Sequence, residues 1–374
     1  MHKLDIEREM LMVTLIGGEG MPTGIADRKK LFWPGGAAGK LCPPWLEDEA
    51  AKLAEASLSS GIFAIVSVAG PQGSGQTARL MVDAFLPLPE LIILGAGHIA
   101  LPLAKLGCML GYRVVVIDDR PEYASAKRFP DASRVVCCSF SDILQHIHPS
   151  PRSSVVIITR GHRHDLECLE KLVNFRLAYL GQIGSGRRIA ILRNHLLEKG
   201  FDRQRLDEIH MPIGLDIGAQ TPEEIAISIA AELVNDRQKG RGRSMSAAAN
   251  AERKQQTPEH ASAENLAVLE LLAEVVHDGT PAALATIVAT RGSTPRKAGA
   301  KLLVFADGHT IGTVGGGCGE AQIRSKALNV IYGGQQLVLV SMNDEETVEE
   351  GMVCGGTMEV FIEPVATFQQ VLAG

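Results

Sequence analysis

Two cysteines near the C-terminus stand in glycine-rich sequence that suits chemistry at sulfur. Cys318 follows Gly315, Gly316 and Gly317, and Cys354 is followed by two further glycines. Glycine leaves the backbone uncovered so that a ligand can approach, and N–H groups at a helix start lower the pKa of a thiol. Two thiolates could therefore bind sulfur or a soft metal. The alternative is that both cysteines are small residues in crowded turns.

A polar, basic stretch precedes the first of these cysteines and suits a phosphate group. Its side chains are Arg291, Ser293, Thr294, Arg296 and Lys297. Cations and uncovered backbone N–H groups in a loop form concave sites for anions. We expect Arg291 and the three glycines before Cys318 to contact a bound cofactor.

A second motif, LIILGAGHIALPLAKLGCMLGYRVVVIDD, has the pattern of a dinucleotide site. An apolar strand leads into Gly95 and Gly97, a helix follows, and a second strand ends at Asp118. Gly95 allows the tight turn, and Gly97 lets the backbone approach a pyrophosphate at the helix start. Asp118 follows about 20 residues later, where an acid binds the ribose hydroxyls.

The nucleotide that this motif binds stays open. Asp118 favours NAD, whereas Arg120 is close enough to meet the 2′-phosphate of NADP, and FAD uses the same fingerprint. His98, directly after the glycines, is counted among the cofactor-binding residues. The alternative is a strand–helix–strand turn that holds no ligand.

Two more polar stretches follow expected strands of the same sheet. TRGHRHD contains His162, His164 and Asp165, which could bind a metal or phosphate or move protons. They could equally be a helix start that Asp165 caps, with solvated histidines. GQIGSGRR contains Gly184 and Ser185 and could cradle an anion before a basic helix start. Both stretches are expected at the carboxyl ends of strands, which is where open α/β sheets bind their ligands.

The elements around these motifs predict an α/β protein. Strands alternating with helices after Pro87 indicate a Rossmann-like parallel sheet. We expect this domain at 87–237, an exposed linker at 238–264 and a mixed α/β domain bearing the cysteines at 265–374. Within them, the expected helices are His98–Leu110, Asp165–Phe175, Arg187–Lys199 and Ala267–Asp278.

Residues 1–86 are interpreted as a degenerate copy of the cysteine-bearing domain. The segment from Thr14 aligns without a gap with the segment from Thr286. After a one-residue shift, the pairs in step are Gly39 with Gly312, Glu47 with Glu320 and Trp45 with Cys318. Ser74 stands where the second copy has Cys354. The first copy would thus keep the scaffold without the reactive groups.

Composition narrows the class of protein. The 374 residues are 45% hydrophobic and 21% charged, as in globular proteins. The net charge of −6 gives no support to nucleic-acid binding, and no run approaches the ~18 apolar residues of a membrane span. Seven mostly isolated cysteines, with no CxxC pair, argue against a secreted disulfide framework or a zinc ribbon. We expect a cytoplasmic protein.

Several of these motifs together carry a family resemblance. GSTPRKAGAKLLV, GTVGGGCGE and MVCGGTMEVFIEP resemble the XdhC/CoxI family of molybdenum hydroxylase maturation factors. LIILGAGHIALPLAKL, VIDDRPEYA, TRGHRHD and GLDIGAQTPEEIAISIAAEL resemble the Rossmann domain that accompanies it. The resemblance covers about residues 87–236 and 265–366. In the familiar arrangement the cysteine domain comes first, whereas here the well-matched copy follows the Rossmann domain.

The resemblance implies a factor that binds molybdenum cofactor (molybdopterin), supports its sulfuration and inserts it into a xanthine dehydrogenase-like hydroxylase. It implies two partners, the hydroxylase apoenzyme and a cysteine desulfurase, and a homodimer is expected. Cys318, Cys354 and His162 are the candidates for sulfur or cofactor handling. The resemblance favours a cofactor chaperone over a stand-alone enzyme. An NAD(P)-dependent oxidoreductase using Cys318 or His162, or a nucleotide-sensing regulator, remains the alternative.

Overall fold

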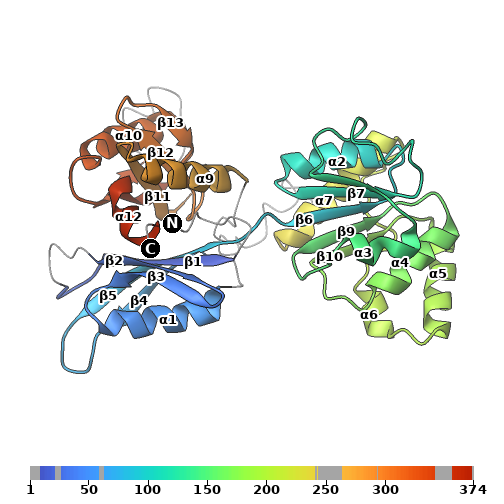
Figure 1. The fold of residues 1–374 in the computed structure, drawn as a ribbon, viewed down its shortest axis with the longest axis horizontal. Helices are drawn as coiled ribbons and strands as arrows, with labels where there is room; N and C mark the ends of the chain where they lie inside the picture. The colour runs from blue at the N-terminus through green and yellow to red at the C-terminus, as the bar shows by residue number, and fades with distance from the viewer. Residues whose placement is uncertain are drawn as a thin grey trace. The chain divides into compact units, whose positions relative to one another are not determined.

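The computed structural model describes residues 9–21, 27–58, 63–240, 242, 263–292, 294–341 and 356–372. The chain folds into two compact units (Figure 1). Unit 1 combines Met1–Pro87 with Lys254–Gly374, and unit 2 is Leu88–Arg253. The two ends of the chain therefore fold together, and the Rossmann-like region forms the other unit.

Unit 2 is built on a parallel five-stranded sheet in the order β10-β9-β6-β7-β8. The strands are β6 (Glu90–Leu94), β7 (Arg113–Asp118), β8 (Arg134–Cys137), β9 (Ser153–Ile157) and β10 (Tyr179–Gln182). The chain moves outward from β6 to β8 and then returns to place β9 on the other side of β6. This reversal is the switch point beside which open α/β sheets bind ligands.

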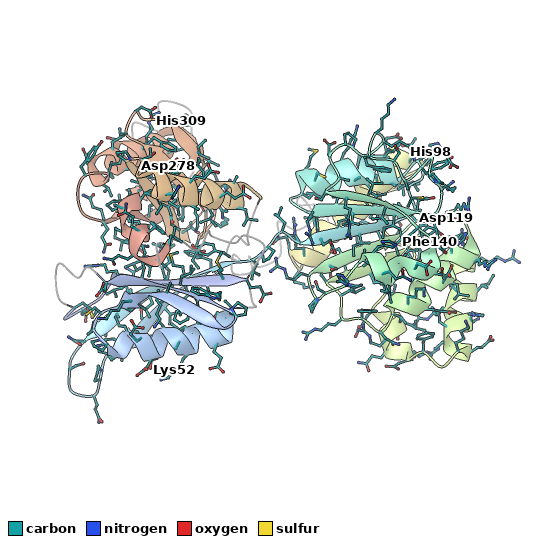
Figure 2. The ribbon with its side chains drawn as sticks, in the orientation of Figure 1. Lys52, His98, Asp119, Phe140, Asp278 and His309 are labelled. Carbon is teal, nitrogen blue, oxygen red and sulfur yellow. The ribbon has the colours of Figure 1, made fainter. Side chains whose placement is uncertain are left out.

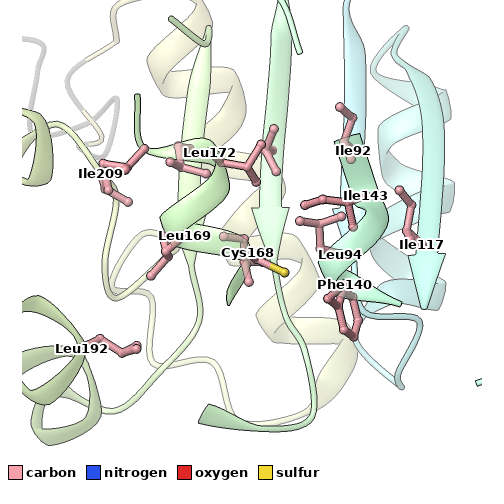
Figure 3. Packing of buried hydrophobic residues seen from close by; sticks show 14 of the residues in the cluster. Ile92, Leu94, Ile117, Phe140, Ile143, Cys168, Leu169, Leu172, Leu192 and Ile209 are labelled. Atoms are coloured by element: carbon pink, nitrogen blue, oxygen red, sulfur yellow. The ribbon is translucent and has the colours of Figure 1, made fainter. Parts of the chain in front are cut away.

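Helices cover both faces of this sheet. The helices are α2 (Ala100–Met109), η1 (Phe140–Asp142), α3 (Ile143–His146), α4 (His162–Leu172), α5 (Gly186–Glu198), α6 (Arg203–Asp207) and α7 (Pro222–Arg237). Alternate strand residues pack on α2 and α7, and the intervening ones pack on α3 to α6. Figure 3 shows part of the cluster that packs on α3 to α6. Its labels include Ile92, Leu94, Ile143, Cys168 and Leu172. Strands buried on both faces explain the continuous apolar runs.

Helix boundaries in unit 2 lie within a few residues of the expected ones. Thr221 and Glu224 form a capping box at the start of α7. The helix expected at Asp165 begins earlier, at His162, because Gly161 takes the N-cap position. Asp165 therefore lies in the first turn and does not cap the helix.

Unit 1 contains two antiparallel sheets with the same strand order, β3-β2-β1-β5-β4 and β13-β12-β11-β15-β14. The first comprises β1 (Met10–Gly17), β2 (Arg28–Trp33), β3 (Gly36–Leu41), β4 (Ala64–Ala69) and β5 (Thr77–Phe85), with α1 (Trp45–Ser57). The second comprises β11 (Ala282–Arg291), β12 (Lys301–Phe305), β13 (Thr310–Gly312), β14 (Gln336–Ser341) and β15 (Thr357–Pro364), with α10 (Gly317–Val330). We call the first set the N-terminal copy and the second the C-terminal copy. The structure thus has the repeated scaffold that the sequence predicts.

Local details of the two copies agree as well. Gly39 and Gly312 have φ of 81° and 83°, and a Cβ built at either would lie 2.5 Å from the carbonyl oxygen of Lys29 or Lys301. Glycine alone tolerates both the positive φ and this approach. The aligned positions of the sequence repeat therefore meet the same backbone requirement.

Each sheet of unit 1 has a helix on one face and the other copy on the opposite face. Leu11, Val13 and Leu15 of β1 pack against α1, and the corresponding residues of β11 pack against α10. The other faces join in mixed clusters that contain residues of both copies. Helices α9 (Ala263–Asp278), η2 (Val365–Phe368) and α12 (Gln369–Leu372) complete the larger cluster. In the described part of the chain, none of the helices has the length and apolar composition that a membrane span requires.

Candidate functional site

The glycine turn after β6 positions the backbone for a phosphate group. Gly95 has φ of 107°, and a Cβ there would lie 2.5 Å from the carbonyl oxygen of Ile158. A Cβ at Gly97 would meet no atom within 4 Å. Gly95 is thus required by the fold, whereas Gly97 keeps open the space before α2. A helix start of this kind favours an anion.

Residues after neighbouring strands gather at the same edge of the unit 2 sheet. His98 follows the end of β6 and is exposed, and Asp119 follows the end of β7 (Figure 2). The guanidinium of Arg160, which follows β9, donates from Nη2 to Asp119 Oδ2 at 2.8 Å. This edge therefore holds both the glycine turn and a row of charged side chains.

Asp118, expected to bind ribose hydroxyls, is held by protein groups. Its Oδ2 accepts from the N–H of Ala96 at 2.7 Å and from Nη2 of Arg120 at 2.9 Å. Its Oδ1 accepts from the N–H and the Nε of Arg120 at 3.0 and 2.8 Å. A carboxylate has about four acceptor positions, so these four donors fill it. Asp118 is also buried, with 1% of its surface exposed.

These contacts determine the charge state of Asp118. Burial acts to raise the pKa of its carboxyl, but the side chain of Arg120 and the N–H groups of Ala96 and Arg120 hold the pKa below its ordinary value. The carboxylate is therefore ionised over the physiological range. Its negative charge is met by the guanidinium of Arg120, which lies 3.6 Å from the ring centre of Tyr123.

Arg128 is a site residue that sequence reasoning missed. Its Nη1 donates to the carbonyl oxygens of Ala96 and Tyr123 at 2.9 and 3.0 Å, and so connects the glycine turn with the loop after β7. Arg120, Arg128 and Arg134 all follow Asp118, and their spacing does not reveal which of them reaches the turn.

Asp165, in the first turn of α4, forms a buried polar cluster at the same edge. Its Oδ1 accepts from the hydroxyl of Thr159 at 2.5 Å, and its Oδ2 pairs with Arg188. Burial raises the pKa of this carboxyl despite the opposing effect of Thr159, Arg188 and Gln182. The cluster fixes the start of α4 against the start of α5.

The turn before α5 contains two predicted site residues, Gly184 and Ser185, and both have a structural role. The hydroxyl of Ser185 is the N-cap of α5 and accepts from the N–H of Arg188 at 3.4 Å. A Cβ at Gly184 would lie 2.8 Å from Cδ1 of Ile189. Both residues are thus explained by the helix start, and Ser185 is exposed beside it.

In unit 1, the glycines before Cys318 form a turn that opens α10. Gly315, Gly316 and Gly317 have φ of 127°, 72° and 66°, which favour glycine at all three positions. Helix α10 begins at Gly317, so the backbone of Cys318 lies at the first turn of a helix rather than at the end of a strand. The first N–H groups of a helix have no partner within it.

Glu320 holds this turn in place. Its Oε2 accepts from the hydroxyl of Thr313 at 2.5 Å, from the N–H of Val314 at 3.2 Å and from the N–H of Gly316 at 3.1 Å. In the N-terminal copy, Glu47 Oε1 accepts from the N–H of Leu41 at 2.6 Å, which is the aligned position. The same capping carboxylate therefore shapes both helix starts.

The loop after β11 contains Thr294, Arg296 and Lys297 and is called the basic loop. It lies against the glycine turn. A Cβ built at Gly315 would lie 2.9 Å from Cβ of Pro295, so the loop and the turn touch. Lys297 Nζ donates to the carbonyl oxygen and hydroxyl of Thr294 at 3.2 and 3.3 Å, and Arg291 is exposed at the end of β11. The structure thus brings together the basic loop and the turn that the sequence assigned to one anion.

Four predicted residues lie wholly or partly outside the described residues. Ser293 and Cys354 lie wholly outside them, as do the side chains of Cys318 and His162, whose backbones occupy the first turns of α10 and α4. Whether the two thiols meet therefore stays a prediction. Within the described residues, no group of three or more histidine, cysteine or acidic side chains could hold a metal ion.

Comparison with known protein families adds to this geometry. Residues 91–233 match the model of the XdhC Rossmann domain, and residues 275–342 match that of the XdhC and CoxI family. The chain belongs to the XdhC and CoxI family. The two matches contain the turn at Gly95 and the turn before Cys318. The N-terminal copy lies outside both matched regions.

Three curated proteins are similar in sequence to parts of this chain. A protein of Bacillus subtilis (strain 168), named as a probable xanthine dehydrogenase subunit, is 32% identical over 164 residues, which are 44% of this chain and 48% of that protein. YqeB of Escherichia coli (strain K12) is 33% identical over 147 residues, which are 39% and 27% of the two chains. The molybdenum cofactor insertion chaperone PaoD of Escherichia coli (strain K12) is 29% identical over 106 residues, 28% and 33% of the two chains. The chain thus spans less than half the length of each.

Proposed function

We propose that this chain is a maturation factor that binds molybdenum cofactor as cargo and transfers it to a molybdenum hydroxylase apoenzyme. The observation that carries the proposal is the glycine turn that opens α10 at Cys318 with the basic loop packed against it. This arrangement lies in the region that matches the XdhC and CoxI family. A relative named as a molybdenum cofactor insertion chaperone supports the same role.

The described residues fit the anionic end of such a cargo. A pterin phosphate carries negative charge, which the N–H groups and the dipole of a helix start stabilise. Arg291 at the end of β11 and Lys297 in the adjoining loop add positive charge. Gly316 leaves space beside the backbone, because a Cβ there would meet no atom within 4 Å.

We assign the sulfur side of the cargo to Cys318, with Cys354 as the second thiol. Helix starts favour thiolates in general, and the thiolate is the form that binds a soft metal. We extend this proposal to the sulfuration of the cargo. The chain would support this step, and a cysteine desulfurase would donate the sulfur. A chaperone of this kind needs partners and has no turnover alone.

Unit 2 would bind a nucleotide at the turn around Gly97. The open space at Gly97 and the start of α2 suit a pyrophosphate. Because four protein donors fill Asp118, a ribose hydroxyl gains no free acceptor there. Arg120 and Arg128 beside it favour a nucleotide with an additional phosphate, and NADP is therefore the preferred candidate over NAD.

The test of the cargo role uses the full chain and measures molybdenum and pterin that co-elute with it after expression in a molybdate-supplied host. The Cys318→Ser and Cys354→Ser variants, singly and together, should lose most of the bound cargo and fail to activate a hydroxylase apoenzyme. Cys137→Ser is the matched control, because Cys137 is an exposed thiol in unit 2. A double variant that retains cargo and activates the apoenzyme as well as the parent would exclude the proposed thiol site.

The same samples separate the chaperone from an oxidoreductase. Steady consumption of NADH or NADPH by the purified chain with a small substrate, abolished by Cys318→Ser or His162→Ala, would favour the enzyme. The expected result is no consumption above that of the boiled protein.

A further inference from the structure

The two copies in unit 1 are related by an approximate two-fold axis. The register of β1 on β5 shifts between Leu15 and Gly17, and that of β11 on β15 shifts between Ile287 and Ala289. With the common strand order, these bulges align β1 with β11 and β5 with β15 residue by residue. Arg79 pairs with Gly17, and Glu359 pairs with Ala289, so Arg79 and Glu359 occupy the same position in the two copies.

Buried ion pairs cross between the copies reciprocally. Lys29 of β2 donates to Glu363 of β15 at 2.7 Å, and Lys301 of β12 donates to Asp83 of β5 at 2.6 Å. Lys29 corresponds to Lys301 in the sequence repeat, and Asp83 corresponds to Glu363 by strand register. Contacts in which i meets j and j meets i are the signature of a two-fold interface.

The apolar contacts follow the same symmetry. One mixed cluster contains Ile16 and Met81 of the N-terminal copy with their counterparts Val288 and Phe361 of the C-terminal copy. In each copy these side chains lie on the sheet face opposite the helix. The joint between the copies is therefore built like the interface of a two-fold dimer.

One contact joins two equivalent positions that carry opposite charges in the two copies. The guanidinium of Arg79 forms a bidentate pair with the carboxylate of Glu359, with N–O distances of 3.1 and 2.8 Å. Equivalent residues touch each other only next to a two-fold axis, so this pair marks the axis. Here the two positions differ in charge, and the pairing of unlike copies is the one that brings opposite charges together.

We propose that the N-terminal copy takes the place of a second chain at this interface, and that the Arg79–Glu359 pair selects it over another C-terminal copy. Two C-terminal copies joined in this way would place Glu359 against Glu359, and two N-terminal copies would place Arg79 against Arg79. The buried lysine pairs do not discriminate, because either like pairing would still set a lysine against a carboxylate. Like charges at an interface reject the wrong partner.

Charge reversals in the full chain test the selection. Arg79→Glu and Glu359→Arg each place like charges on the axis within one chain, and the double variant Arg79→Glu with Glu359→Arg restores attraction. Urea unfolding is followed by the fluorescence of Trp33 and Trp45, the two tryptophans of the chain, both in the N-terminal copy. Each single variant should have a lower urea midpoint than the parent, and the double variant should recover most of the loss.

Mixing the two single variants tests the partner directly. Refolded together with different tags, they can place opposite charges on the axis only between chains, so cross-chain complexes should exceed those of either variant alone by about tenfold, measured by native mass spectrometry. Arg113→Glu is the matched control, because Arg113 pairs with Glu90 within unit 2. A double variant as destabilised as the single ones, or mixing that yields no more cross-chain complex than the control, would overturn the proposal. If a single variant is insoluble alone, co-expression of the pair should yield soluble complex, and failure to do so counts against it equally.

Discussion

The guanidinium of Arg120 grips the carboxylate of Asp118 through two parallel hydrogen bonds, Nε to Oδ1 at 2.8 Å and Nη2 to Oδ2 at 2.9 Å. The remaining acceptor positions of Asp118 are filled by backbone N–H groups of Ala96 and Arg120. The acid of the dinucleotide fingerprint thus stabilises the glycine turn. A ligand that reads it directly must first displace Arg120.

Removal of Arg120 should therefore change which nucleotide unit 2 prefers. Arg120→Ala frees two acceptor positions on Asp118 and removes a cation, so NAD should bind better relative to NADP by roughly tenfold, the equivalent of one charged hydrogen bond. Isothermal titration of the two nucleotides measures the ratio. Arg113→Ala, at the opposite end of the same strand, is the control. An unchanged ratio would show that Arg120 does not face the nucleotide.

The pH dependence of unit 2 stability should contain a contribution from Asp118. Its pKa is lower in the folded chain than in the unfolded chain, so the stabilisation is complete above the ordinary pKa of about 4 and is lost as the pH falls through the folded value. Asp118→Asn should be less stable than the parent at pH 7, and the difference should shrink at lower pH. Hydrogen exchange in peptides that cover residues 91–104 measures this locally. A difference that grows towards acid would contradict the assignment.

Gly97 and Gly95 should respond differently to a side chain. Gly97→Val should fold, since a Cβ there meets no atom within 4 Å, but it should abolish nucleotide binding by filling the phosphate space. Gly95→Val should fail to fold or lose several kcal/mol, because its Cβ would lie 2.5 Å from a carbonyl oxygen at φ of 107°. Circular dichroism and nucleotide titration distinguish the two effects. Nucleotide binding retained by a folded Gly97→Val would place the ligand elsewhere.

Glu320 and Glu47 are equivalent carboxylates in the two copies, and they offer a test of which copy carries the function. Glu320→Ala removes the acceptor of Thr313, Val314 and Gly316 and should loosen the turn at Cys318, at a cost of about 1–3 kcal/mol. Glu47→Ala should cost a comparable amount by releasing Leu41. Hydroxylase activation should fall with Glu320→Ala alone. Equal loss in both variants would mean that stability, rather than the turn, limits activation.

The elements and the repeat can be predicted from the order of the amino acids. Continuous apolar strands and amphipathic helices predict the parallel sheet because burial on one or both faces requires those patterns. The repeat was visible because Gly39 and Gly312 meet the same backbone requirement, and because Glu47 and Glu320 cap the same kind of turn. Such local constraints leave a mark at fixed spacing along the chain.

The pairing of side chains that are distant in sequence could not be predicted without the folded structure. Lys29 and Glu363 are 334 positions apart, and their contact depends on strand order, register and the packing of two sheets. The role of Arg120 also escaped the motif, because the fingerprint specifies an acid at Asp118 without showing which donors reach it. A buried charge binds whatever opposite charge the fold brings within reach, and that choice depends on three-dimensional proximity rather than on spacing.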